Sequence, residues 1–161
     1  MSTAIKCMPA MSEAMKKQCE EEFRRLCREK GVPYTTQRRA VLQAVLELGN
    51  HPTAEEVCSS AIVRNAGVSR ATVYRTLESL ARLGAVIKVG HGGSAIRYDG
   101  RIELHHHLIC LRCNAIIDIA SAGLDSTPVP DTSEFGFFVK DFRVQLSGLC
   151  RRCRTDNPKL H

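Results

Sequence analysis

The amino-acid sequence predicts an α+β fold in two parts, a helical module that closes in a β-hairpin and a smaller α/β module. Apolar residues recur at helical spacing, between capping residues, as far as Gly84. Beyond Gly100 they alternate as in strands, and four cysteines occur in two close pairs. We therefore expect domains at residues 1–98 and 99–161, with a hinge near residues 99–100.

Two helices open the first module. Residues 12–30 carry apolar side chains at spacings of three and four residues, which predicts an amphipathic helix. Pro33 separates it from a second helix, which Thr35 or Thr36 should cap and Gly49 should end.

A helix-turn-helix pattern follows. Thr53 and Glu56 form a T-x-x-E capping box, which predicts a helix from there to about Asn65. Gly67 ends this helix and Ser69 caps the next one. A connection this short is typical of a helix-turn-helix.

The helix after that turn has one apolar stripe, which runs from Val73 to Leu80. Arg70, Tyr74 and Arg75 lie largely off the stripe and could face a partner. Arginine can bond phosphates or guanine edges, and a tyrosine ring can contact a thymine methyl group. The plainer alternative makes Tyr74 a packing residue and the arginines a solvated face.

A β-hairpin completes the module, because AVIKVG and AIRYDG are expected to form two short strands joined by HGGS. Three helices followed by a hairpin make a winged helix, whose last helix enters the major groove of double-stranded DNA. Residues 1–100 hold fifteen Lys/Arg against ten Asp/Glu, most of the net charge of +6. This charge also favours a polyanionic partner, so we interpret the module as a DNA-binding domain.

Three strands are expected in the second module, at HHHLICLRC, AIIDIA and FRVQLSGLC. Pro128 and Pro130 exclude a long helix between the last two, although a short one could follow Pro130. The module is small for a core of its own. Metal crosslinking and a sheet shared across a dimer would both compensate.

The paired cysteines are the most specific signal in the sequence. Cys110-x-x-Cys113 and Cys150-x-x-Cys153 supply four thiolates, the complete tetrahedral shell of a structural Zn²⁺. The alternatives are chance pairing or a redox CxxC motif, which would normally start a helix in a βαβ unit. Neither pair has that context, so we predict structural zinc.

A second set of metal donors contains nitrogen and oxygen. His105 and His107 are two residues apart on a strand and point to one face, whereas His106 points to the other. The other candidate ligands are His51, Asp99 and Asp118. Donors of this kind suit Fe²⁺, Mn²⁺ or Zn²⁺. Singly, each has a plain explanation, as a helix-end residue, a turn former or a surface group.

From about residue 20 to Cys153, the sequence resembles the ferric uptake regulator family of metal-dependent repressors. The matching segments are HPTAEEV, SRATVYRTLESLARLGAV, RYD, HHHLICLRC, IIDI and GLCRRC, in the family order. The resemblance implies an N-terminal winged-helix DNA-binding domain and a C-terminal α/β dimerisation domain with structural zinc. It also implies a homodimer on operator DNA.

The resemblance assigns the four paired cysteines to the zinc site. It assigns the regulatory Fe²⁺ or Mn²⁺ site to His51, Asp99, His105, His107 and Asp118. Aspartates at 99 and 118 resemble the peroxide-sensing branch, whereas the iron-sensing branch typically has glutamates. For that branch the resemblance implies that His51 or His105 is oxidised when peroxide reacts at bound iron. Phe142 and Leu104 stand where an additional metal site has histidines, so we do not expect that site.

The sequence thus predicts a repressor in which one exchangeable cation fixes the angle between the two domains. One alternative is a repressor of the same family that measures iron or another divalent metal without a peroxide role. Another is a non-haem iron or zinc enzyme, against which the sequence offers no separate general base or substrate-binding motif. No apolar run could span a membrane and the N-terminal residues lack a secretory signal, so we expect a cytoplasmic protein.

Overall fold

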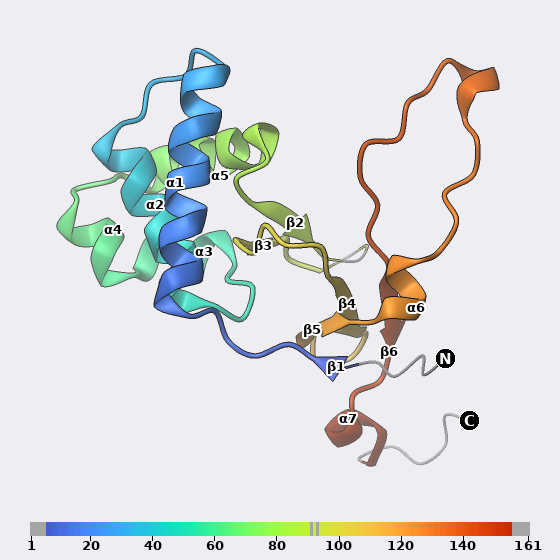
Figure 1. Ribbon diagram of the computed structural model, residues 1–161. Helices are drawn as coiled ribbons and strands as arrows, with labels where there is room; N and C mark the ends of the chain where they lie inside the picture. Colours follow the sequence, from blue (N-terminus) through green and yellow to red (C-terminus); the bar gives the residue numbers. More distant parts are fainter. Residues whose placement is uncertain (1–5, 91, 93, 156–161) are drawn as a thin grey trace. The chain divides into compact units, whose positions relative to one another are not determined.

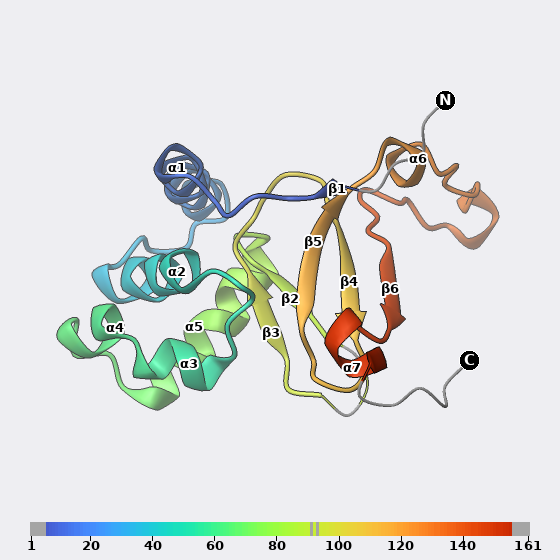
Figure 2. The ribbon, with the colours of Figure 1, turned by 90° about the horizontal axis from the view of Figure 1, so that it is seen from below.

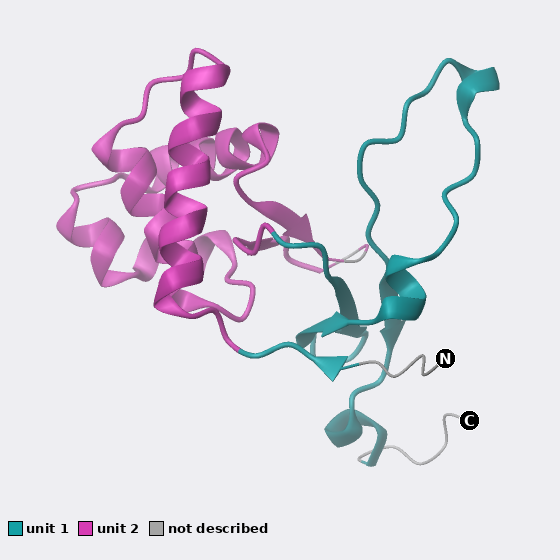
Figure 3. Cartoon of the chain, in the orientation of Figure 1, with its two compact units in different colours: residues 1–9, 103–161 teal, residues 10–102 magenta. Residues whose placement is uncertain are grey.

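A computed structural model of the chain describes residues 6–90, 92 and 94–155 (Figure 1). The chain divides into two compact units, which Figure 3 distinguishes by colour. The helical unit is Ala10–Ile102, and the sheet unit joins residues 1–9 to residues 103–161. Helices and small sheets together confirm the predicted α+β class.

The described part of the helical unit contains five helices and a two-stranded hairpin. They are α1 (Glu13–Glu29), α2 (Thr36–Leu48), α3 (Ala54–Ser59), α4 (Ala61–Asn65), α5 (Arg70–Leu83), β2 (Ile87–Val89) and β3 (Arg97–Asp99). The side chains of Thr35 and Ser69 accept hydrogen bonds from the N–H groups of Arg38 and Thr72, as capping residues do. Gly84 ends α5 in the left-handed conformation, at φ 82°.

The expected single helix from Thr53 to Asn65 is wrong, because the chain leaves helical geometry at Ser60. The capping box that begins it is present, with reciprocal bonds between Thr53 and Glu56. Ser60 has φ −66° and ψ 145°, and its hydroxyl accepts a hydrogen bond from the N–H of Val63. The serine side chain thus starts a second short helix in place of a continued first one.

The core of the helical unit contains the stripe predicted on α5. Val73, Leu77 and Leu80 are fully buried and belong to one cluster with Phe23 of α1 and Leu42 of α2. The stripe therefore fixes which face of α5 is inward.

The hairpin predicted after α5 is present, with β2 and β3 antiparallel and Ile87 opposite Asp99. Residues 91 and 93 of the expected turn lie outside the described residues. A further bridge joins Thr53 to Arg97, so the hairpin is tied to the start of α3.

Gly100 follows β3 at a point of close packing, and its replacement by alanine should destabilise the helical unit. A Cβ atom there would lie 2.6 Å from Cδ2 of Leu46 and 3.6 Å from Cγ1 of Val45, both buried. Overpacking of this kind costs about 1–3 kcal/mol of unfolding free energy. Urea unfolding at fixed metal content measures it. In a Leu46→Ala background the added methyl group has room, so an equal cost there would contradict this account.

The described part of the sheet unit contains one four-stranded sheet in the order β1-β5-β4-β6. Its elements are β1 (Lys6–Cys7), β4 (His106–Cys110), β5 (Ile116–Ala120), α6 (Ala122–Asp125), the 3₁₀ helix η1 (Ser133–Phe135), β6 (Gln145–Gly148) and α7 (Arg151–Thr155). β4 runs antiparallel to β5 and parallel to β6. Figure 2 shows these three strands side by side, with β6 beside β4 at one edge.

Two features of this sheet differ from the sequence-based expectation. β1 was not expected, and it pairs Lys6 with Ala120 of β5. The third strand was expected to begin at Phe142 and to be half-buried, but it begins at Gln145 and all four of its residues are exposed. As an edge strand, β6 has a partner on one side only within the described residues. The short helix expected after Pro130 is confirmed as η1.

Candidate metal centres and nucleic-acid interface

The four paired cysteines come together at one end of the sheet. Each can offer a sulfur atom such that all four atoms lie within 4.8 Å of one another. Cys110 ends β4, Cys113 lies in the turn after it, Cys150 precedes α7 and Cys153 lies within α7. Asn114, at φ 56°, completes the turn by donating its N–H to the carbonyl of Cys110 at 2.9 Å.

The spacing of the sulfur atoms fits a zinc ion. Four sulfurs at about 2.3 Å from one Zn²⁺ in a tetrahedron lie about 3.8 Å apart. The Sγ atoms of Cys113 and Cys150 are 3.7 Å apart. Since the sulfurs fill the whole shell, the site would be structural and closed to substrate.

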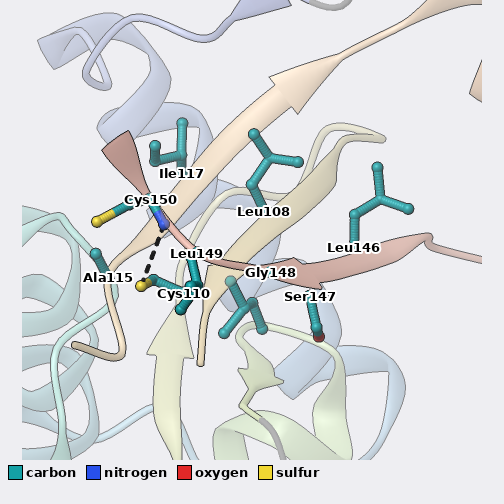
Figure 4. Close-up of a pocket in the computed structure, with 10 residues that line it drawn as sticks. Leu108, Cys110, Ala115, Ile117, Leu146, Ser147, Gly148, Leu149 and Cys150 are labelled. Atoms are coloured by element: carbon teal, nitrogen blue, oxygen red, sulfur yellow. Dashed lines mark hydrogen bonds between the residues drawn. The ribbon is translucent and has the colours of Figure 1, made fainter. Parts of the chain in front are cut away.

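Hydrogen bonding and burial act in opposite directions on these thiols. The backbone nitrogen of Cys150 donates a hydrogen bond to Sγ of Cys110 at 3.3 Å and lowers the pKa of that thiol to about 6. The dashed line in Figure 4 marks this bond. Burial raises the pKa of Cys153 to about 12. A divalent cation is the partner that can hold all four as thiolates, so the donor chemistry also fits zinc.

An apolar face lies beside this cluster. Leu108 of β4 is the cross-strand neighbour of both Ile117 and Leu146. These residues line a pocket of about 190 Å³ (Figure 4). Ile117 and Leu146 are both 39% exposed, so the face is only partly covered within one chain.

The sheet unit brings together three of the five nitrogen and oxygen donors. His105 directly precedes β4, and His107 lies opposite Asp118 of β5. The Nε2 atoms of His105 and His107 are 3.1 Å apart, and Oδ1 of Asp118 lies 3.9 Å and 3.5 Å from them. The prediction that the two histidines share a face is therefore confirmed.

This geometry suits a metal ion. Two nitrogens at about 2.1 Å from one ion, at right angles to each other, lie about 3.0 Å apart. Nδ1 of His105 is 2.7 Å from the carbonyl of Glu103, which favours the tautomer that leaves Nε2 to coordinate. The mixed His/Asp donor set fits Fe²⁺ or Mn²⁺.

The helical unit holds the other two donors. His51 lies just before α3 and Asp99 ends β3, and Nε2 of His51 is 3.9 Å from Oδ2 of Asp99. His51 has φ 54° and its carbonyl accepts a hydrogen bond from Arg97 of β3 at 2.9 Å. A left-handed conformation is uncommon for a residue with a side chain, so the fold holds this histidine against a local preference.

His106 has a separate role. Its Nε2 lies 3.0 Å from Oδ1 of Asp125, and its Nδ1 accepts the N–H of Val144 at 3.1 Å. The ring is fully buried and ties α6 and the segment before β6 to β4. It therefore belongs to the packing of the sheet unit.

The residues predicted to contact DNA meet an acidic side chain that the sequence analysis missed. Tyr74 and Arg70 both donate hydrogen bonds to Oε1 of Glu55, the arginine at 3.0 Å. The guanidinium of Arg70 also lies 5.8 Å from the ring centre of Tyr74. Tyr74 is 37% exposed, so it is a surface residue of α5. Arg75 donates to Thr72 in the preceding turn.

Comparison with known proteins shows the family to which the chain is similar. A model of the ferric uptake regulator family matches residues 29–147. The peroxide-responsive repressor PerR of Staphylococcus epidermidis is 30% identical over 92% of the chain and 99% of its own length. The ferric uptake regulation protein of Bacillus subtilis is 36% identical over 74% of the chain and 83% of its own length.

A solved structure agrees with the fold. The ferric uptake regulator Fur of Helicobacter pylori superposes with a TM-score of 0.68 at 22% identity, covering 91% of this chain and 97% of its own. That Helicobacter pylori protein has three functional metal-binding sites. Among the described residues of the present chain, the helices are too short or too polar to cross a membrane.

Proposed function

Because the chain belongs to the ferric uptake regulator family, we propose that it is a metal-dependent repressor that binds double-stranded operator DNA as a homodimer. Membership in this family of transcriptional regulators confirms that the chain is not an enzyme. The single observation that carries the proposal is the pair of imidazole nitrogens 3.1 Å apart, with Asp118 beside them. The thiolate cluster is distinct from this pair, so the chain has one set of donors for a permanent ion and another for an exchangeable one.

We assign the regulatory site to His51, Asp99, His105, His107 and Asp118, with Fe²⁺ or Mn²⁺ as the ion. The first two come from the helical unit and the other three from the sheet unit. An ion that takes ligands from both would restrict the angle between them. In a two-fold dimer, that angle sets the distance between the two α5 helices, which must match the half-site spacing on DNA.

Operator binding is assigned to Arg70, Tyr74 and Arg75. All three lie on α5, off the buried stripe, on the helix that a winged helix inserts into the major groove. Homodimer formation is supported by the partly exposed apolar face of Ile117 and Leu146, which a second chain would cover. Since the target is DNA, we place the protein in the cytoplasm.

Peroxide sensing is the response that we propose. Asp99 and Asp118 stand at two positions where, by the resemblance described above, the peroxide-sensing branch has aspartate and the iron-sensing branch has glutamate. Bound Fe²⁺ would supply the electrons that activate peroxide, and the ring of His51 or of His105 would take up oxygen. An oxidised ring is a poorer ligand, so the operator would be released.

Peroxide treatment of the metal-loaded protein tests this response. In the Fe²⁺ form we expect added oxygen on a peptide that contains His51 or His105, together with loss of DNA binding. Peptide mass mapping and gel shifts measure the two effects. The Mn²⁺ form is the control and should remain unmodified and bound.

The Fe²⁺ form could instead keep its metal-dependent DNA binding after peroxide, with no added oxygen on either peptide. That result would contradict peroxide sensing. The chain would then measure iron or another divalent metal directly. The 36% identity to the ferric uptake regulation protein of Bacillus subtilis is what favours that alternative.

A further inference from the structure

One carboxylate holds two of the three residues that we assign to operator binding. Oε1 of Glu55 accepts hydrogen bonds from the guanidinium of Arg70 and from the hydroxyl of Tyr74. The side chains of Glu55 and Arg70 are 58% and 68% exposed. All three side chains are accessible, so the cluster is open to a partner that approaches α5.

The acid next to it in the sequence has a different task. Glu56 accepts bonds from the backbone N–H and the hydroxyl of Thr53 and so completes the capping box. Glu55 has no part in that cap, because its carboxylate is directed to α5. Glu55 also lies in the first turn of α3, where a negative charge is favoured, but that position does not require its bonds to Arg70 and Tyr74.

We infer that Glu55 is a specificity-determining residue, which lowers affinity for non-specific DNA while orienting Arg70 and Tyr74 toward the operator. This inference rests on the proposed function, since it presumes that α5 contacts DNA.

The effect on non-specific DNA follows from charge. Such binding depends almost entirely on neutralising phosphates. The carboxylate of Glu55 already neutralises the charge of the Arg70 guanidinium, so a phosphate gains little by contacting it. Glu55 also places its own negative charge close to the DNA backbone.

The operator complex differs, because the carboxylate occupies only part of the arginine fork. Guanidinium carries five N–H donors, and Glu55 takes one through Nη2. The remaining donors can bond a base edge while the carboxylate fixes the plane of the group. Glu55 thereby opposes phosphate contacts without opposing base contacts, which raises the ratio of operator to non-specific affinity.

The test compares two DNA duplexes at several salt concentrations. One is the tightest-binding 30-base-pair duplex selected from a random library by the full-length Mn²⁺-loaded protein, and the other is its scrambled counterpart. For Glu55→Gln we expect affinity for the scrambled duplex to rise about 3–10-fold, with a slope in log salt about 0.9 steeper. Affinity for the selected duplex should stay within about two-fold, so the ratio falls.

Glu29→Gln is the matched control. It removes the same charge from a carboxylate that is also paired with an arginine, Arg25 of α1, a helix that carries none of the assigned DNA contacts. The double variant Arg70→Gln/Glu55→Gln tests the mechanism, because the effect of Glu55→Gln should shrink when its arginine partner is absent.

An unchanged affinity ratio in Glu55→Gln, or an equal change in Glu29→Gln, overturns the inference. The proposed function stands or fails separately, on whether the unaltered protein prefers the selected duplex in a metal-dependent way. A thermal unfolding scan of each variant checks that the helical unit is intact.

Discussion

Replacement of Cys150 by serine should abolish zinc binding and unfold the sheet unit. The zinc ligands connect the end of β4, the turn after it and α7, segments far apart in the sequence. Among the described residues, β4 is the one strand that β6 pairs with, and the four residues of β6 are exposed, so little else holds β6 without the ion. Structural zinc sites contribute about 10–16 kcal/mol of apparent binding free energy, which is more than a unit of this size gains from its core.

The measurements are zinc content per chain, thermal unfolding and oligomeric state. We expect zinc to fall well below one per chain, the unfolding transition of the sheet unit to disappear, and DNA binding to be lost with it. Cys58→Ser is the control, because that thiol lies in the helical unit outside the cluster. If Cys150→Ser keeps a full complement of zinc and a cooperative transition, the cluster is not the structural site.

The cysteine cluster and the helix starts could be predicted because their signals are local. A CxxC pair places two sulfurs within reach of one ion whatever surrounds it, and the caps at Thr35 and Ser69 bond to N–H groups three residues away. His105 and His107 share a face for an equally local reason, the two-residue period of a strand.

Features set by distant contacts could not be predicted. β1 is two residues long, and it is a strand because it pairs with β5, with Lys6 opposite Ala120 and Cys7 opposite Ile119. The T-x-x-E pattern predicted that Glu56 caps α3, but nothing local predicted that its neighbour Glu55 reaches α5. The contact of Glu55 depends on how α3 packs against α5, which the local sequence pattern does not specify.

The break at Ser60 lies between these cases. Serine inside a helical pattern can bond to the backbone and start a new turn, so the sequence contains a signal for the break. The apolar periodicity on both sides pointed to one continuous helix. The hydroxyl of Ser60, bonded to the N–H of Val63, decides between the two.

Replacement of His107 by alanine should make DNA binding insensitive to Mn²⁺. Its Nε2 lies between the other donors of the sheet unit, 3.1 Å from Nε2 of His105 and 3.5 Å from Oδ1 of Asp118. Loss of such a ligand should weaken Mn²⁺ binding by about 100-fold or more, since even outer-shell changes cost 10–100-fold. At a Mn²⁺ concentration that saturates the unaltered protein, the operator affinity of His107→Ala should then be about 5–150-fold lower, the usual range of coupling between two sites.

The neighbouring residue supplies the control. The ring of His106 forms hydrogen bonds with Asp125 and Val144 and is not one of the metal donors assigned above. His106→Gln retains a polar group long enough to reach Asp125. This variant should keep Mn²⁺-dependent binding, whereas His107→Ala should keep its zinc and its metal-free DNA affinity. Calorimetry measures the affinity for Mn²⁺, and fluorescence anisotropy measures the affinity for the selected duplex. If DNA binding by His107→Ala depends on Mn²⁺ as strongly as that of the unaltered protein, the regulatory ion binds elsewhere in the chain, because loss of a ligand must weaken the binding of the ion that it holds.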